Sequence, residues 1–200
     1  MTRIGSLRVT TIQTVEPAER SRALSILVLA FDTDPVMRWL WPEPDAYLRH
    51  FPGLLLGFGG RAFDNRAAHV TDDYRGGALW LPPGVGPDDE ALEALARDRV
   101  PEPIRSELLS VFEQMAESVP PEPHWHLAFI GVDPTWHGHG IGAALMTHAL
   151  ERIDEAGSRA YLESTNPRNI TLYRRHGFEV TREIRVGTAP PLFPMLRPAR

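Results

Sequence analysis

Three glycines at alternate positions, Gly138, Gly140 and Gly142, stand where a strongly apolar run gives way to a helical pattern. Because glycine has no Cβ, the backbone N–H groups of such a turn can converge on an anion. The N-terminus of the following helix adds unpaired N–H groups and a partial positive charge. The spacing therefore predicts a phosphate-binding turn, and a merely flexible turn is the alternative.

Two other kinds of phosphate site use glycines in this way. A Walker P-loop needs Lys and then Ser or Thr after its last glycine, whereas Ala143 and Ala144 follow Gly142 and the chain contains no lysine. A dinucleotide-binding turn fits the G-x-G-x-x-G/A pattern from Gly138 to Ala143, and Glu163 stands where a ribose-binding acid would. However, the segment DPTWH separates the apolar run from the first glycine, which is too loose for that tight turn, and no further βαβ units follow. A dinucleotide enzyme remains the weaker alternative.

The segment VDPTWHGHGIGAAL resembles the acetyl-CoA loop of the GNAT superfamily, whose pattern is Arg/Gln-x-x-Gly-x-Gly/Ala and whose glycines fall here on Gly140 and Gly142. A second segment, ESTNPRNITLYRRHGFEV, resembles the Asn…Leu-Tyr…Gly-Phe segment that follows the fifth strand in that superfamily. The resemblance covers about residues 124–186. Within the superfamily these segments look most similar to puromycin N-acetyltransferase and related proteins.

The resemblance implies a mixed α/β fold: a central, mostly antiparallel sheet whose parallel fourth and fifth strands splay apart, flanked by helices. It also implies that an amine attacks acetyl-CoA directly in a ternary complex. The complete lack of cysteine agrees with direct attack, because no thiol nucleophile is present. The expected cofactor-binding residues are Ile130, Gly131, Val132, His137, Gly138, His139, Gly140, Ile141, Gly142, Ala143, Asn166 and Tyr173.

Direct transfer requires a base for the amine and an acid for the departing thiolate. Tyr173 matches the family tyrosine that protonates the sulfur, and packing of its ring in the core is the alternative. His126 is the first candidate base, because imidazole, with an ordinary pKa near 6.5, accepts a proton at neutral pH. Glu163 is the second candidate, and a structural role for His126 stays open. Asn166 matches the family asparagine that contacts pantetheine, although a plain helix N-cap explains it equally well.

His137 stands where the family pattern has Arg or Gln. Neutral imidazole offers one donor whereas arginine is always charged, so we expect the affinity for acetyl-CoA to weaken between about pH 6 and 8. The pairs His124/His126 and His137/His139 also spell H-x-H, a spacing that suits metal ligands on a strand. No acidic ligand accompanies either pair, and no metal site is predicted.

Composition narrows the class of protein. The 200 residues carry 21 basic and 26 acidic side chains, a net charge of −5 that argues weakly against nucleic acid and suits a cationic amine. No run approaches the ~20 apolar residues that cross a bilayer, and the first residues lack the apolar core of a signal peptide. We therefore expect a cytoplasmic protein whose partner is a small-molecule amine, not a membrane or nucleic acid, and leave a homodimer open.

Hydrophobic periodicity and turn residues predict strands at 7–15, 67–71, 77–81, 124–132, 160–165, 178–186 and 192–196. They predict helices at 17–31, 45–63, 88–99, 104–118, 138–157 and 166–176. The strand–turn–helix–strand order over 124–165 implies a parallel pair joined by a crossover. We expect one domain, 1–200, with a helical insertion at about 83–123 that helps to line the acceptor pocket. A non-catalytic, acyl-CoA-binding regulatory module on the same fold is the competing function.

Overall fold

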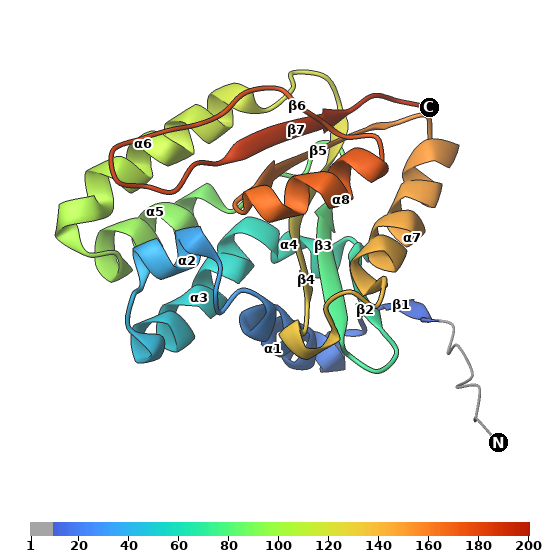
Figure 1. The fold of residues 1–200 in the computed structure, drawn as a ribbon, viewed down its shortest axis with the longest axis horizontal. Coiled ribbons are helices and arrows are strands. Elements are labelled where there is room, and N and C mark those ends of the chain that lie inside the picture. Colours follow the sequence, from blue (N-terminus) through green and yellow to red (C-terminus); the bar gives the residue numbers. More distant parts are fainter. Residues whose placement is uncertain (1–9) are drawn as a thin grey trace.

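A seven-stranded sheet runs through residues 10–200, the part of the chain that the computed structural model describes (Figure 1). Its spatial order is β1-β2-β3-β4-β5-β7-β6, with β4 and β5 parallel and the other neighbours antiparallel. The expected mixed sheet is therefore confirmed, although residues 7–9 of the first predicted strand lie outside the described part. The strands are β1 (Ile12–Thr14), β2 (Ala68–Thr71), β3 (Gly76–Leu81), β4 (His124–Val132), β5 (Arg159–Ser164), β6 (Glu179–Val180) and β7 (Phe193–Arg197).

Helices pack on both faces of the sheet. Side chains of α1 and α3 join one buried cluster with Leu79 and Phe129, while α7 joins a second cluster with Ala78 and Leu127. Neighbouring strand residues such as Ala78 and Leu79 point to opposite faces, so these two clusters lie on opposite sides of the sheet. On β4 a register shift between Leu127 and Phe129 interrupts the alternation, so that these two residues also belong to different faces. The α-helices are α1 (Arg20–Ala30), α2 (Pro35–Leu40), α3 (Pro44–Gly59), α4 (Arg61–Asp64), α5 (Asp89–Arg99), α6 (Glu102–Ser118), α7 (Ile141–Glu155) and α8 (Ile170–Arg175). Short 3-10 turns are η1 (Pro17–Glu19), η2 (Pro134–Trp136) and η3 (Pro167–Asn169).

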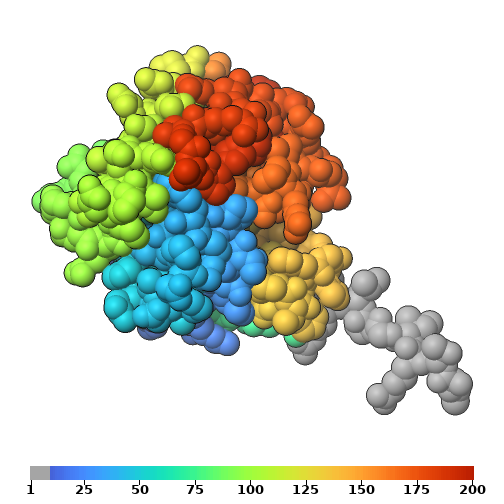
Figure 2. All heavy atoms as spheres, turned by 60° about the vertical axis from the view of Figure 1, so that its left-hand side comes forward, coloured from blue at the N-terminus to red at the C-terminus, as the bar shows by residue number. Residues whose placement is uncertain are grey.

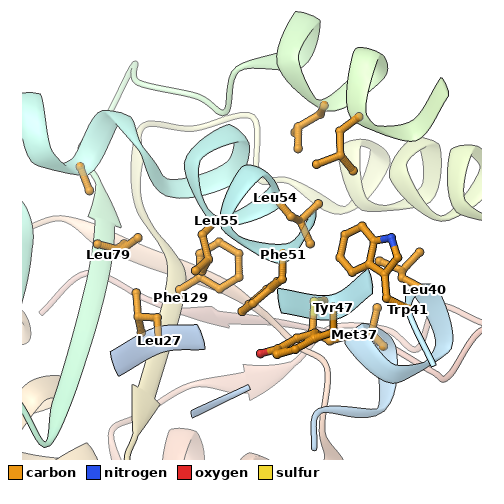
Figure 3. Packing of buried hydrophobic residues seen from close by; sticks show 14 of the residues in the cluster. Leu27, Met37, Leu40, Trp41, Tyr47, Phe51, Leu54, Leu55, Leu79 and Phe129 are labelled. Carbon is orange, nitrogen blue, oxygen red and sulfur yellow. The ribbon is translucent and has the colours of Figure 1, made fainter. Parts of the chain in front are cut away.

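The core beneath α1 and α3 is built around aromatic rings (Figure 3). Phe51 stacks on Tyr47 with ring centroids 5.0 Å apart and meets Phe129 of β4 edge-on at 6.1 Å. The Tyr47 hydroxyl, which would otherwise be an unpaired polar group in this core, donates a hydrogen bond to the carbonyl of Val28 at 2.6 Å. The rings hold α1 and α3 against β4.

Two differences from the sequence expectations have clear physical causes. Helix α2 was not predicted: it begins at Pro35 after Asp34, whose carboxylate accepts the backbone N–H groups of Val36 and Met37. The predicted strand over 178–186 is wrong in length, because β6 ends at Val180. After the pair Val180–Met195, the next residue of β7 that would continue the ladder is Pro194, which has no backbone N–H to donate to β6.

Helices α5 and α6 follow β3 and return the chain to β4 (Figure 1). In Figure 2 this green segment lies beside the red C-terminal segment and the blue-to-cyan segment of α1 to α3. The Glu107 carboxylate of α6 accepts hydrogen bonds from the backbone N–H and the hydroxyl of Thr188, at 2.7 and 2.9 Å. The helical insertion is thus tied to the segment between β6 and β7. Within residues 10–200, no helix combines the length and hydropathy needed to cross a membrane.

Candidate active site

The site begins where β4 and β5 stop pairing. Their parallel ladder runs as far as Leu127 opposite Leu162, after which β4 continues to Val132 with only β3 as a partner in the described chain. The edge of β4 that faces β5 therefore presents backbone groups without a ladder partner. Gly131 has no room for a side chain, because a Cβ there would lie 2.6 Å from the Cβ of Ala30 in α1. Ile130, Gly131 and Val132 form this edge, where the sequence placed the pantetheine arm.

A buried imidazole–carboxylate pair lies at the closed end of this opening. His126 points away from the α7 face, and its Nε2 lies 2.7 Å from Oε2 of Glu163 on β5. Their side chains are only 11% and 7% exposed. The Glu163 carboxylate also contributes, after burial itself, to raising the pKa of the neighbouring Tyr161 phenol. The structure thus brings together the two residues that the sequence offered as alternative bases.

Two cavities meet at this pair. The larger has a volume of about 680 Å³ and lies among the Gly84–Pro87 loop, α5, α6 and the start of β4. The smaller, about 70 Å³, borders Ala128, Phe129 and Thr165, at the opening between β4 and β5. His126 and Glu163 line both cavities. A molecule in the large cavity therefore reaches the strand opening past the imidazole–carboxylate pair.

The glycine turn follows β4 and leads directly into α7. Gly138 and Gly140 have φ angles of 81° and 80°, in the left-handed region that side chains other than glycine rarely adopt. Gly140 is the N-cap of α7 and supplies no side-chain hydrogen bond. The first N–H groups of the helix, at Ile141, Gly142 and Ala143, therefore have no partner within the helix. Such donors, together with the helix dipole, suit an anion, and they lie at the far end of the opening from His126.

The side chains of His137 and His139 form hydrogen bonds with backbone carbonyl groups in and just before the turn. Nε2 of His137 lies 3.1 Å from the carbonyl oxygen of Val132, so it donates its proton there. Nδ1 of His139 lies 3.1 Å from the carbonyl of His137 and 3.2 Å from that of Trp136. The side chain of Arg75 covers the Trp136 ring at 3.4 Å from its centroid. His137 thus keeps only Nδ1 for a ligand in this arrangement. Within residues 10–200, no group of three or more candidate metal ligands is present.

Tyr173 and Asn166 lie beyond β5. Tyr173 is buried in α8, where its ring meets Phe178 edge-on at 6.3 Å, and neither cavity at His126 includes it. Burial, followed by the nearby Asp34 carboxylate, raises the pKa of this phenol, so that it holds its proton at neutral pH. The amide oxygen of Asn166 accepts the backbone N–H of Arg168 at 3.1 Å, which is an N-cap bond of the turn η3.

Asp34 was missed as a residue of this region. Its Oδ2 accepts a hydrogen bond from the Thr165 hydroxyl at 2.6 Å, which joins the start of α2 to the end of β5. Burial raises the pKa of this carboxyl, and its hydrogen bonds from Thr165 and the α2 backbone oppose the rise. The signal was present in the sequence as Asp-Pro before an apolar run, a typical N-cap followed by Pro at the first helical position.

Sheet order, the parallel β4/β5 opening and the glycine turn before α7 define the GNAT fold. Residues 106–178 match the model of the Acetyltransferase (GNAT) family. The chain thus has the GNAT fold, and its residues 106–178 are similar to this acetyltransferase family.

Solved structures of related fold cover nearly the whole chain. A Corynebacterium glutamicum protein described as histone acetyltransferase HPA2 and related acetyltransferase is 24% identical, with a TM-score of 0.66 over 96% of this chain and 97% of that one. A Drosophila melanogaster polyamine N-acetyltransferase, which forms N-acetylagmatine, is 20% identical, with a TM-score of 0.63 over 94% and 97%. At these identities the likeness concerns the fold.

A curated relative matches a shorter segment. The mycothiol acetyltransferase of Propionibacterium freudenreichii subsp. shermanii is 37% identical over 71 residues, which are 34% of this chain and 22% of that protein. The match thus spans about a fifth of that relative's length. The predicted likeness to puromycin N-acetyltransferase, within the family, stays a prediction.

The position of His137 predicts how an arginine there would act. Nε2 of His137 is already bonded to the carbonyl of Val132, whereas a guanidinium is always charged and offers further donors to a phosphate. We expect His137→Arg to raise the affinity for acetyl-CoA about five- to tenfold. Calorimetric titration of both proteins with acetyl-CoA measures the change, and an unchanged or lower affinity contradicts the prediction.

Proposed function

We propose that the protein transfers an acetyl group from acetyl-CoA to a primary amine, in one step within a ternary complex. The buried His126–Glu163 pair carries the proposal, because it lies between a cavity large enough for an acceptor and the opening in the sheet. The match of residues 106–178 to the GNAT family model supports the acyl-CoA donor. Relatives that acetylate amines, such as the polyamine N-acetyltransferase, support the class of acceptor.

The proposed roles follow from the positions of the polar groups. Backbone groups of Ile130–Val132 pair with the pantetheine arm, and the turn 137–143 binds the pyrophosphate. If Nε2–H of His126 donates to Glu163, Nδ1 is the basic atom that removes a proton from the substrate ammonium, directly or through water. The neutral amine that results then attacks the thioester. The carboxylate holds the ring and stabilises the imidazolium that forms. Tyr173, protonated at neutral pH, is the proposed acid for the thiolate.

A panel of primary amines incubated with acetyl-CoA tests the proposal. We expect thiol release that requires both the amine and the protein, together with an N-acetylated product identified by mass spectrometry. Binding of CoA without release of thiol from any amine would favour the regulatory module. Absence of CoA binding would overturn the assignment of the glycine turn as well. The acyl chain length is tested in the same assay by replacing acetyl-CoA with longer acyl-CoA donors.

A further inference from the structure

The walls of the large cavity are mainly apolar. Of its roughly 680 Å³, most is bounded by side chains of α5, α6 and the 84–87 loop, and such a volume falls in the range that encloses a drug-sized molecule. Leu109 on α6 lines it although 47% of this leucine is exposed. The principal apolar residues are Phe58, Val85, Leu92, Leu109, Phe112 and Met115.

Apart from histidines, the charged side chains that line this cavity are all acidic. Within its described lining they are Asp89, Glu93, Glu122 and Glu163, and no arginine borders it. Glu122 is paired with Arg159 at 3.1 Å, whereas no ion pair within residues 10–200 involves Asp89 or Glu93. A cation entering between α5 and the start of β4 therefore gains attraction from carboxylates, and an anion is repelled. The charge pattern selects for an ammonium.

The arrangement of the two cavities orients such a molecule. Besides His126 and Glu163, the cavities share Phe58, Phe112 and Met115, so the passage from the large to the small one is apolar on one side and carries the base on the other. The small cavity of about 70 Å³ admits a reacting group and not the body of an acceptor. The amine end must therefore point toward the sheet, with the rest of the molecule among α5 and α6.

From this lining we infer that the acceptor is an amphiphilic amine: a primary ammonium on a bulky alkyl or aryl body. The ammonium lies beside His126 and Glu163, and the body lies against the apolar side chains of the cavity, where burial of hydrocarbon is favourable and burial of uncompensated polar groups is costly. The inference rests on the proposed acetyl transfer and adds the chemical class of the acceptor. It assigns specificity to the helical insertion.

A homologous series of amines tests the inference. We expect kcat/KM with acetyl-CoA to rise about fourfold per methylene from ethylamine towards octylamine, until the cavity is filled. Phenylethylamine should match the longer alkylamines. Rates that are flat along the series, or that fall as methylenes are added, overturn the inference. If no amine releases thiol, the proposed function fails. Calorimetric binding of the same series to the CoA-bound protein then still decides the inference, because equal dissociation constants for ethylamine and octylamine overturn it.

Substitution of Leu109 locates the effect in this cavity. Leu109→Arg replaces part of the apolar wall with a positive charge, which repels the substrate ammonium, at a helix position that is exposed. We expect kcat/KM for octylamine to fall at least tenfold. The value for ethylamine should change less than threefold. The matched control is Leu48→Arg on α3, a leucine that is 60% exposed and borders none of the described cavities. Circular dichroism confirms the folding of both variants. Equal loss for both amines, or equal loss in the control, contradicts the assignment.

Discussion

His126→Ala lowers kcat about 100- to 1,000-fold while the affinity for CoA stays within about twofold of the unsubstituted protein. The reason is geometric: the imidazole is the basic group that borders both the acceptor cavity and the strand opening, and the phosphate turn lies at the other end of β4. Steady-state kinetics with a reactive amine and calorimetry with CoA measure the two effects.

Two further substitutions decide between the candidate bases. Glu163→Gln keeps the shape of the side chain but removes the charge that stabilises the imidazolium, so we expect a large loss of kcat even if the carboxylate only orients His126. The double variant His126→Ala/Glu163→Gln decides: a loss no larger than that of His126→Ala means that Glu163 acts through the ring, and a further loss of about tenfold or more would make Glu163 a base in its own right. His148→Ala, on α7 and the other face of the sheet, is the matched control and should retain full activity.

Asp154→Asn lowers the free energy of unfolding by about 2–3 kcal/mol, and the melting temperature by about 5–10 °C. The guanidinium of Arg197 is 2% exposed and binds both carboxylate oxygens of Asp154, at 2.5 and 2.7 Å, as well as the carbonyl of His176. Removing the carboxylate leaves a buried charge without its counter-ion. The cost is below that of a wholly buried pair because Asp154 itself is 35% exposed. Denaturant titration gives the difference.

The contribution of Asp154 also depends on pH. Its hydrogen bond from Arg197 holds the pKa of the carboxyl below the ordinary value of 3.8. A lowered folded-state pKa gives stability that is complete above the unfolded value and is lost as the pH falls through the folded value. The free energies of unfolding of the unsubstituted protein and of Asp154→Asn should therefore show their full difference at pH 7 and become equal as the pH falls below about 4. Asp98→Asn is the control: its pair with Arg97 is exposed, so its substitution should cost less than about 1 kcal/mol at any pH. A constant difference from pH 7 to pH 3 would contradict this account.

The second half of the fold was predictable because local patterns were strong there. The bounds of β4 were predicted as the structure has them, and the glycines of the turn fall where positive φ angles require them. The parallel pairing of β4 with β5 followed from the connection between them. By contrast, the place of β7 between β5 and β6 depends on pairing between distant segments, which no local pattern encodes.

The candidate site was predictable as a set of residues but not as an arrangement. His126 and Glu163 were separate alternatives in the sequence, because they lie 37 positions apart and only the parallel pairing of β4 with β5 brings their side chains into contact. Asp34 escaped notice because its hydrogen bond to Thr165 joins residues 131 positions apart. The acceptor cavity has no motif: it is a shape left between α5, α6 and the sheet, and only the tertiary packing creates it.

The course of β4 has a consequence for how such a chain can diversify. One continuous strand carries His126, the backbone edge at 130–132 and the link to the phosphate turn. Inserting a single residue within its ladder with β5 would move the imidazole to the opposite face of the sheet and separate it from Glu163. The walls of the large cavity, however, come mainly from the preceding helices α5 and α6. Under the proposed function, substitutions in these helices would change which amine fits and leave the register of the reactive groups intact, so selection for a new substrate would not need to pass through an inactive protein.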